Sequence, residues 1–146
     1  MRKIYTLAIT LIVAFSLAGC MGGSDSLTPV AATKMDQKEV CNVDKLGIDT
    51  VLANAKMYNA AAIKEEVEFR RLDINNRDLI IAVEEGLKSG AKEVSPLNFK
   101  GKANKTKFKI EYAAHRACTF GLNALQQKHE GKSAWRLAVP GDGFKY

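Results

Sequence analysis

Apolar residues recur with a helical period in three segments of this chain. In the first segment they follow at steps of three and four, as on one face of an amphipathic helix; they are Ile48, Val51, Leu52, Ala55, Tyr58 and Ala62. We expect this helix to begin at Asp44 or Asp49, with Asp49 or Thr50 as its capping residue.

The end of this first helix has two interpretations. Glu66 and Arg70 have the i,i+4 spacing of a stabilising pair, which favours a helix that continues to about Arg71. Val67, Phe69 and Arg71 alternate with polar residues, which is typical of a short strand. We favour the helix.

The second helix is marked at both ends. Asn75 is a good N-cap residue, and Asp78 follows three positions later, as in a capping box. Ile74 and Leu79 occupy the two positions of a hydrophobic staple, and Gly90 is a natural stop. Its buried face is expected to consist of Leu79, Ile80, Val83 and Leu87.

Residues 94–112 have the pattern of an antiparallel hairpin. Phe108, Ile110 and Tyr112 alternate with charged residues, and Gly101 and Asn104 belong to its turn. Neighbouring lysines would oppose the dipole at a helix N-terminus, which also favours extended chain here.

A third helix is expected from Ala113 to about Lys128, with Gly131 as its end. Its apolar face consists of Ala114, Ala117, Cys118, Gly121 and Leu125. Residues 134–139 are typical of one more strand, which Pro140 stops. The sequence therefore predicts a small α+β fold, with about three helices packed on a short antiparallel hairpin or sheet.

The first twenty residues have the three parts of an export signal. Arg2 and Lys3 form a positive start, residues 7–17 form an apolar run, and small residues precede Cys20. The apolar run is shorter than the roughly 20 residues of a membrane-spanning helix. The segment Leu17-Ala18-Gly19-Cys20 resembles the lipobox of bacterial lipoproteins.

This resemblance implies that residues 1–19 are a signal peptide that is removed. Cys20 then carries a diacylglycerol and an N-acyl chain such as palmitate, which together anchor a protein stably to a membrane. Met21 is not the aspartate that retains enteric lipoproteins at the inner membrane, so the resemblance implies the outer membrane and a periplasmic or surface position. Residues 20–36 form the lipidated start and a flexible tether, and residues 37–146 form a single globular domain.

Two cysteines remain once Cys20 carries lipid. Exported compartments are oxidising, so we expect a disulfide between Cys41 and Cys118. The alternative is a pair of buried free thiols. The chain has no Cys-x-x-Cys motif, which argues against thioredoxin-like redox chemistry.

Charge is distributed unevenly along the chain. Residues 20–87 carry 8 basic and 12 acidic groups, whereas residues 88–146 carry 12 basic and 4 acidic groups. Five lysines fall within ten residues of the basic part, at Lys100, Lys102, Lys105, Lys107 and Lys109. The basic end suits an anionic lipid surface, an acidic polymer or an acidic protein partner.

In a regular hairpin, Lys105, Lys107 and Lys109 would project from one face, with Phe108 and Ile110 toward the core. These lysines and Trp135 are the candidate partner-binding or anion-binding residues. The alternative is a solvated edge strand whose lysines prevent edge-to-edge pairing.

Other chemistry has little support in the sequence. His115 and Cys118 are one helical turn apart, but the disulfide is the more favourable role for Cys118, so we expect no metal site. The common catalytic motifs are absent, and adjacent glutamates on a helix do not face one another. We expect no catalytic residues, no cofactor beyond the lipid on Cys20, no small-molecule substrate and no nucleic-acid partner.

The combined pattern favours a non-catalytic, lipid-anchored accessory protein that binds or helps to assemble a larger cell-envelope complex. In general architecture it is similar to small accessory lipoproteins such as secretin pilotins. A stand-alone binding or inhibitory module of the immunity type is the alternative. A passive protein that contacts lipid or cell wall through its lysines is a third interpretation.

Overall fold

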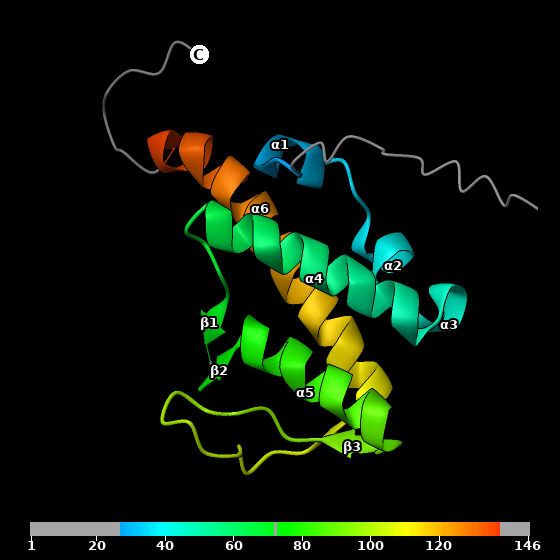
Figure 1. Cartoon of the computed structure of the whole chain (residues 1–146). Helices are drawn as coiled ribbons and strands as arrows, with labels where there is room; N and C mark the ends of the chain where they lie inside the picture. The colour runs from blue at the N-terminus through cyan, green and yellow to red at the C-terminus, as the bar shows by residue number, and fades with distance from the viewer. Residues whose placement is uncertain (1–26, 72, 138–146) are drawn as a thin grey trace, which may run out of the picture.

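The computed structural model describes residues 27–71 and 73–137, which form helices and two pairs of short strands (Figure 1). The three long helices are α4 (Ile48–Lys64), α5 (Asn76–Ser89) and α6 (Ile110–Leu137). Three single-turn helices precede them: α1 (Pro29–Ala32), α2 (Gln37–Val40) and α3 (Val43–Leu46). The antiparallel pairs join β1 (Arg70–Arg71) to β2 (Ile74–Asn75), and β3 (Glu93–Val94) to β4 (Phe108–Lys109). The predicted α+β class is confirmed.

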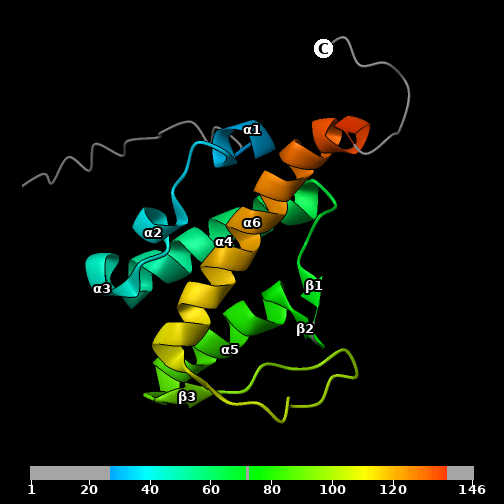
Figure 2. The ribbon, with the colours of Figure 1, turned by 180° about the vertical axis from the view of Figure 1, so that it is seen from behind.

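Helix α6 is the centre of the domain, and both α4 and α5 pack across it (Figures 1 and 2). The core lies between these three helices, because each turns its predicted apolar face inward. Its largest fully buried apolar side chains include Tyr58 and Val51 from α4, Val83 from α5, and Leu122 and Leu125 from α6. No helix of the described residues is both long and apolar enough to cross a membrane.

The crossing of α4 and α6 is close at Gly121. A Cβ atom at this position would lie 2.9 Å from Tyr58 Cβ and 3.0 Å from the backbone nitrogen of Asn59. A glycine is needed here because any larger side chain would separate the two helices. The small residues on the predicted face of α6 therefore set the distance between the helices.

The packed body begins earlier than the expected boundary at residue 37. The Thr28 side chain accepts a hydrogen bond from the Ala31 N–H at 3.2 Å, and Pro29 begins helix α1. The Gln126 side-chain amide of α6 donates to the carbonyls of Ala32 and Met35, which holds this turn against the domain. Residues 20–26 of the expected tether lie outside the described residues.

Helix α4 ends at Lys64, so the favoured extension to Arg71 is wrong. Of the alternative strand, only Arg71 lies in β1, whereas Val67 and Phe69 are in irregular chain. The reason is local: Glu66 has a left-handed φ of 59°. The Val67 N–H then reaches back to the Ala62 carbonyl at 2.8 Å, which is the long bond of a Schellman motif. The chain leaves the helix there and enters β1.

The predicted ends of α5 are confirmed. Asn75 is the N-cap residue, and its side-chain amide donates to the Asp78 carboxylate at 2.9 Å. Gly90 ends the helix in the left-handed conformation, with φ of 69°. Glycine adopts this conformation without the strain that a Cβ atom causes.

The hairpin prediction is confirmed in part, at the β3–β4 pair and at one further antiparallel bridge between Leu97 and Ala103. Glu93 pairs with Lys109, and Val94 pairs with Phe108. Beyond this pair α6 begins at Ile110, so Ile110 and Tyr112 are helical, contrary to the prediction. Ile110 is buried at the start of the helix. Both patterns predict this burial, because Ile110 fits the helical spacing of the α6 core face as well as the alternation of a strand.

Helix α6 also continues past its predicted end. Gly131 lies inside it with open space around its α-carbon, and residues 134–137 are helical, contrary to the predicted strand. A single internal glycine weakens a helix by about 1 kcal/mol relative to alanine and does not by itself end it. Residues 138–140 lie outside the described residues.

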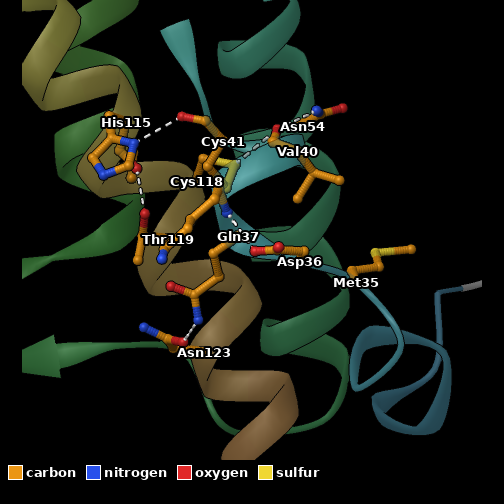
Figure 3. Close-up of a disulfide and its surroundings, with 12 residues drawn as sticks. Met35, Asp36, Gln37, Val40, Cys41, Asn54, His115, Cys118, Thr119 and Asn123 are labelled. Atoms are coloured by element: carbon orange, nitrogen blue, oxygen red, sulfur yellow. Dashed lines mark hydrogen bonds between the residues drawn. A yellow bond between two sulfur atoms is a disulfide. The ribbon is translucent and has the colours of Figure 1, made fainter. Parts of the chain in front are cut away.

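The predicted disulfide is confirmed: Cys41, after α2, is bonded to Cys118 of α6 (Figure 3). Both cysteines are fully buried, and they lie 77 positions apart in the chain. His115 Nδ1 donates to the Cys41 carbonyl at 2.7 Å, and the Asn54 amide donates to the Val40 carbonyl at 2.8 Å. The single-turn N-terminal helices are thus joined covalently and by hydrogen bonds to the long helices.

Candidate functional site

The clustered lysines lie in and beside one long loop. We call residues 95–107, between β3 and β4, the basic loop; it lies at the same end of the domain as β2 (Figures 1 and 2). Lys100, Lys102, Lys105 and Lys107 belong to it, and Lys109 lies next to it in β4. All five lysines are exposed, and within the described residues none of them forms an ion pair.

Side chains of the loop hold its backbone in place. The Asn98 side-chain oxygen accepts from the backbone N–H groups of Lys100 and Lys102, at 2.9 and 3.0 Å. The Phe99 N–H donates to Asp73 Oδ1 at 3.2 Å, which ties the loop to the turn between β1 and β2. Such hydrogen bonds from short polar side chains are typical of ordered turns.

The expectation that alternate lysines project from one strand face is wrong. Only Lys109 is in a strand, whereas Lys105 and Lys107 lie in irregular chain. The Asn104 side chain accepts a hydrogen bond from the Thr106 N–H at 3.0 Å, and this local turn separates the Leu97–Ala103 bridge from β4. The positive charge is therefore spread along a loop.

A row of stacked side chains follows the start of α6. Arg116 lies with its guanidinium carbon 4.4 Å from the centroid of the Phe120 ring and 5.8 Å from that of Tyr112. The Phe120 ring stacks on Phe69 at 3.8 Å between centroids, and Tyr112 contacts Phe108 at 6.1 Å. Positions 112, 116 and 120 repeat every four residues, which places them on one side of α6, and Phe108 precedes them in β4.

Arg116 has the most distinctive environment in this row. Its side chain is half-buried, and the rings beside it restrict its rotation. Nevertheless, among the described residues no carboxylate or carbonyl accepts a hydrogen bond from its guanidinium. An oriented guanidinium with all five N–H donors available is suited to bind an anion.

Arg116 also forms part of the wall of a cavity of about 250 Å³. The cavity lies where β1, β2, α5, α6 and the basic loop meet. Its lining is apolar over most of its area and contains two arginines; the lining residues are Arg71, Ile74, Leu79, Asn104, Thr106, Phe108, Ala113, Arg116 and Phe120. Among the residues that the structure describes, no acidic side chain lines it.

The nearby carboxylates have other partners. Asp73 accepts from the Phe99 N–H, Asp78 accepts from Asn75, and Glu68 pairs with Arg70 at 3.1 Å. Arg71 is exposed at the cavity and forms no ion pair within the described residues. The cavity and the basic loop therefore form one positively charged region with an apolar interior.

The other predicted site residues are not in this region. Trp135 belongs to the far end of α6, and Cys20 lies outside the described residues. Cys118 is in the disulfide, and the described residues contain no group of three or more histidine, cysteine or acidic side chains that is suited to a metal ion. Arg71 and Arg116 were missed; for Arg116, the four-residue spacing from Phe108 to Phe120 was the available signal.

Together, the fold and the candidate site define a small disulfide-linked α+β domain with a basic, partly aromatic surface region. No protein-family model matches the chain, and no match was found among curated proteins or solved structures.

Proposed function

We propose that this protein is a lipid-anchored, non-catalytic accessory protein of the bacterial cell envelope, and that it binds an acidic segment of a larger envelope complex. The observation that carries this proposal is the region formed by the basic loop and the adjoining cavity. The cations of this region have no acidic partner among the described residues. Exposed and half-buried aromatic rings lie beside them. Protein interfaces are enriched in arginine and aromatic residues in this way.

Two further features support an exported protein. The lipobox-like start of the chain supplies an anchor at Cys20, and the buried Cys41–Cys118 disulfide suits an oxidising compartment. An anchored protein of this kind is held close to its partner, which raises the effective concentration of a modest binding surface. We place it at the outer membrane because Met21 follows the lipidated cysteine.

The test is crosslinking in cells, followed by affinity purification of the full-length protein and mass spectrometry. A variant in which the five lysines of the basic loop and β4 are replaced by glutamine should lose its dominant envelope partner. The matched control removes five exposed lysines elsewhere, at Lys34, Lys38, Lys64, Lys88 and Lys132. This control should keep the partner, because it changes the net charge equally but leaves the binding region intact.

Replacement of Cys20 by serine should release the protein from the membrane and lower the recovery of the same partner. If both lysine variants recover the partner equally well, the basic loop is not the binding surface. If no envelope protein is enriched by the wild-type chain, the accessory-protein proposal fails and a stand-alone binding module is favoured.

A further inference from the structure

We propose that the cavity binds the C-terminal residue of the partner polypeptide, with its apolar side chain inside and its α-carboxylate on Arg71 and Arg116. This inference rests on the proposed function, since it identifies the part of the partner that the site recognises. It follows from the size of the cavity, its two arginines and the charge that surrounds it.

The size of the cavity limits its occupant to a small group. A volume of about 250 Å³ corresponds to roughly eight water molecules at about 30 Å³ each. This is smaller than the pockets that hold drug-sized ligands, at about 300–1,000 Å³. One leucine-sized or phenylalanine-sized side chain with its terminal carboxylate is an occupant of suitable size. Ile74, Leu79 and Phe120 provide apolar contact for it.

The two arginines favour an anion beside the apolar group. Arg116 is oriented by the rings of Phe120 and Tyr112, so it loses little conformational entropy when it binds a carboxylate. In a C-terminal residue the carboxylate and the side chain are attached to the same carbon atom. An internal acidic residue with an apolar residue directly beside it does not meet this requirement, because adjacent side chains of an extended chain point to opposite faces.

The charge beyond the cavity favours a polypeptide over a small carboxylic acid. Asn104 and Thr106 line the cavity, and Lys105 and Lys107 lie immediately beside them in the basic loop. Positive charge therefore continues outward from the cavity along the exposed loop. An acidic chain that leaves the cavity would lie along these lysines, whereas a small acid confined to the cavity would not reach them.

Fluorescence anisotropy with the full-length protein in detergent tests this inference. The probe is a fluorescein-labelled hexapeptide of four aspartates, one glycine and a C-terminal phenylalanine, prepared with a free carboxylate and with a C-terminal amide. We expect the free-carboxylate form to bind about 10-fold or more tightly, because a charge-assisted pair is lost in the amide. 3-Phenylpropionate serves as the small competing acid.

Arg116→Gln and Arg71→Gln should each remove the preference for the free carboxylate. The matched control is Arg77→Gln, which alters an exposed arginine at the start of α5 that does not line the cavity. It should keep the preference. Arg71 is exposed, so its variant does not depend on the stacked row and tests the site independently of folding.

Three results would overturn the inference. The first is that the two peptide forms bind equally tightly, and the second is that 3-phenylpropionate binds as tightly as the peptide. The third is that neither peptide binds at 1 mM, which is about the weakest affinity worth measuring. Each of them leaves the proposed function standing if the crosslinked partner still depends on the basic-loop lysines. Failure of the wild-type chain to enrich any envelope protein, with the carboxylate preference retained, would instead contradict the proposed envelope role.

Discussion

Replacement of Gly121 by alanine should destabilise the domain, although alanine is the better helix former. The added methyl group would lie 2.9 Å from Tyr58 Cβ, 3.0 Å from the Asn59 nitrogen and 3.2 Å from the Tyr58 carbonyl carbon. Favourable contacts between carbon atoms lie at about 3.5–4.0 Å. All three atoms belong to the backbone or are fixed to it, so no side-chain rotation relieves the contact.

The magnitude follows from two opposing effects. Alanine favours helix over glycine by about 1 kcal/mol, whereas the insertion of one carbon into a well-packed interface costs about 1–3 kcal/mol or more. Since α4 and α6 must move apart by several tenths of an ångström along this crossing, we expect the upper part of that range. The net loss in the free energy of unfolding should be about 1–2 kcal/mol.

Gly131→Ala is the matched control, because Gly131 lies in the same helix and nothing comes within 4 Å of the added carbon. It should stabilise the domain by up to about 1 kcal/mol. Urea denaturation followed by circular dichroism measures both variants. The reasoning is refuted if Gly121→Ala is as stable as the wild type while Gly131→Ala shows its gain, because the close crossing would then have no energetic effect.

Three further predictions concern the disulfide and two titrating groups. The double variant of Cys41 and Cys118 to alanine should lose about 4 kcal/mol in chemical denaturation, since the bridge closes a long loop; a loss below 1 kcal/mol would contradict this. Burial raises the pKa of Tyr58 above its ordinary value of 10.0, so stability should fall as the pH rises above about 10, and Tyr58→Phe should show a smaller fall. A hydrogen bond from Lys128 lowers the pKa of Glu65, so the stabilising contribution of this carboxylate is lost as the pH falls through the lowered value. Nuclear magnetic resonance titration should show the Glu65 pKa move upward in Lys128→Met, and an unchanged value would contradict the pairing.

The elements that could be predicted are those whose signals are local. Helix α5 has a capping residue, the two staple positions and a terminal glycine within seventeen residues, and each acts on its own few neighbours. The end of α4 was missed because Glu66 takes a left-handed conformation that glutamate rarely adopts. Residue composition does not predict this backbone conformation of Glu66, which depends on the position at which β1 begins.

The boundary between β4 and α6 shows a different kind of ambiguity. Phe108, Ile110 and Tyr112 alternate as in a strand, while Ile110, Ala113 and Ala117 also follow helical spacing. The structure resolves the conflict through packing: Ile110 is buried at the start of α6, and Tyr112 remains half exposed. Burial of the helical face over the full length of α6 outweighs the short-range alternation.

The sequence by itself determined the lipobox-like start, the pairing of the two remaining cysteines, the amphipathic faces of the long helices and the cluster of five lysines. These features depend on residue type and on spacing along the chain. The tertiary structure alone decided that Arg71 and Arg116 line one cavity with the end of the basic loop. Residues so far apart in the chain meet only because α4 and α5 pack across α6, and that arrangement depends on contacts such as the one at Gly121, which no local pattern specifies.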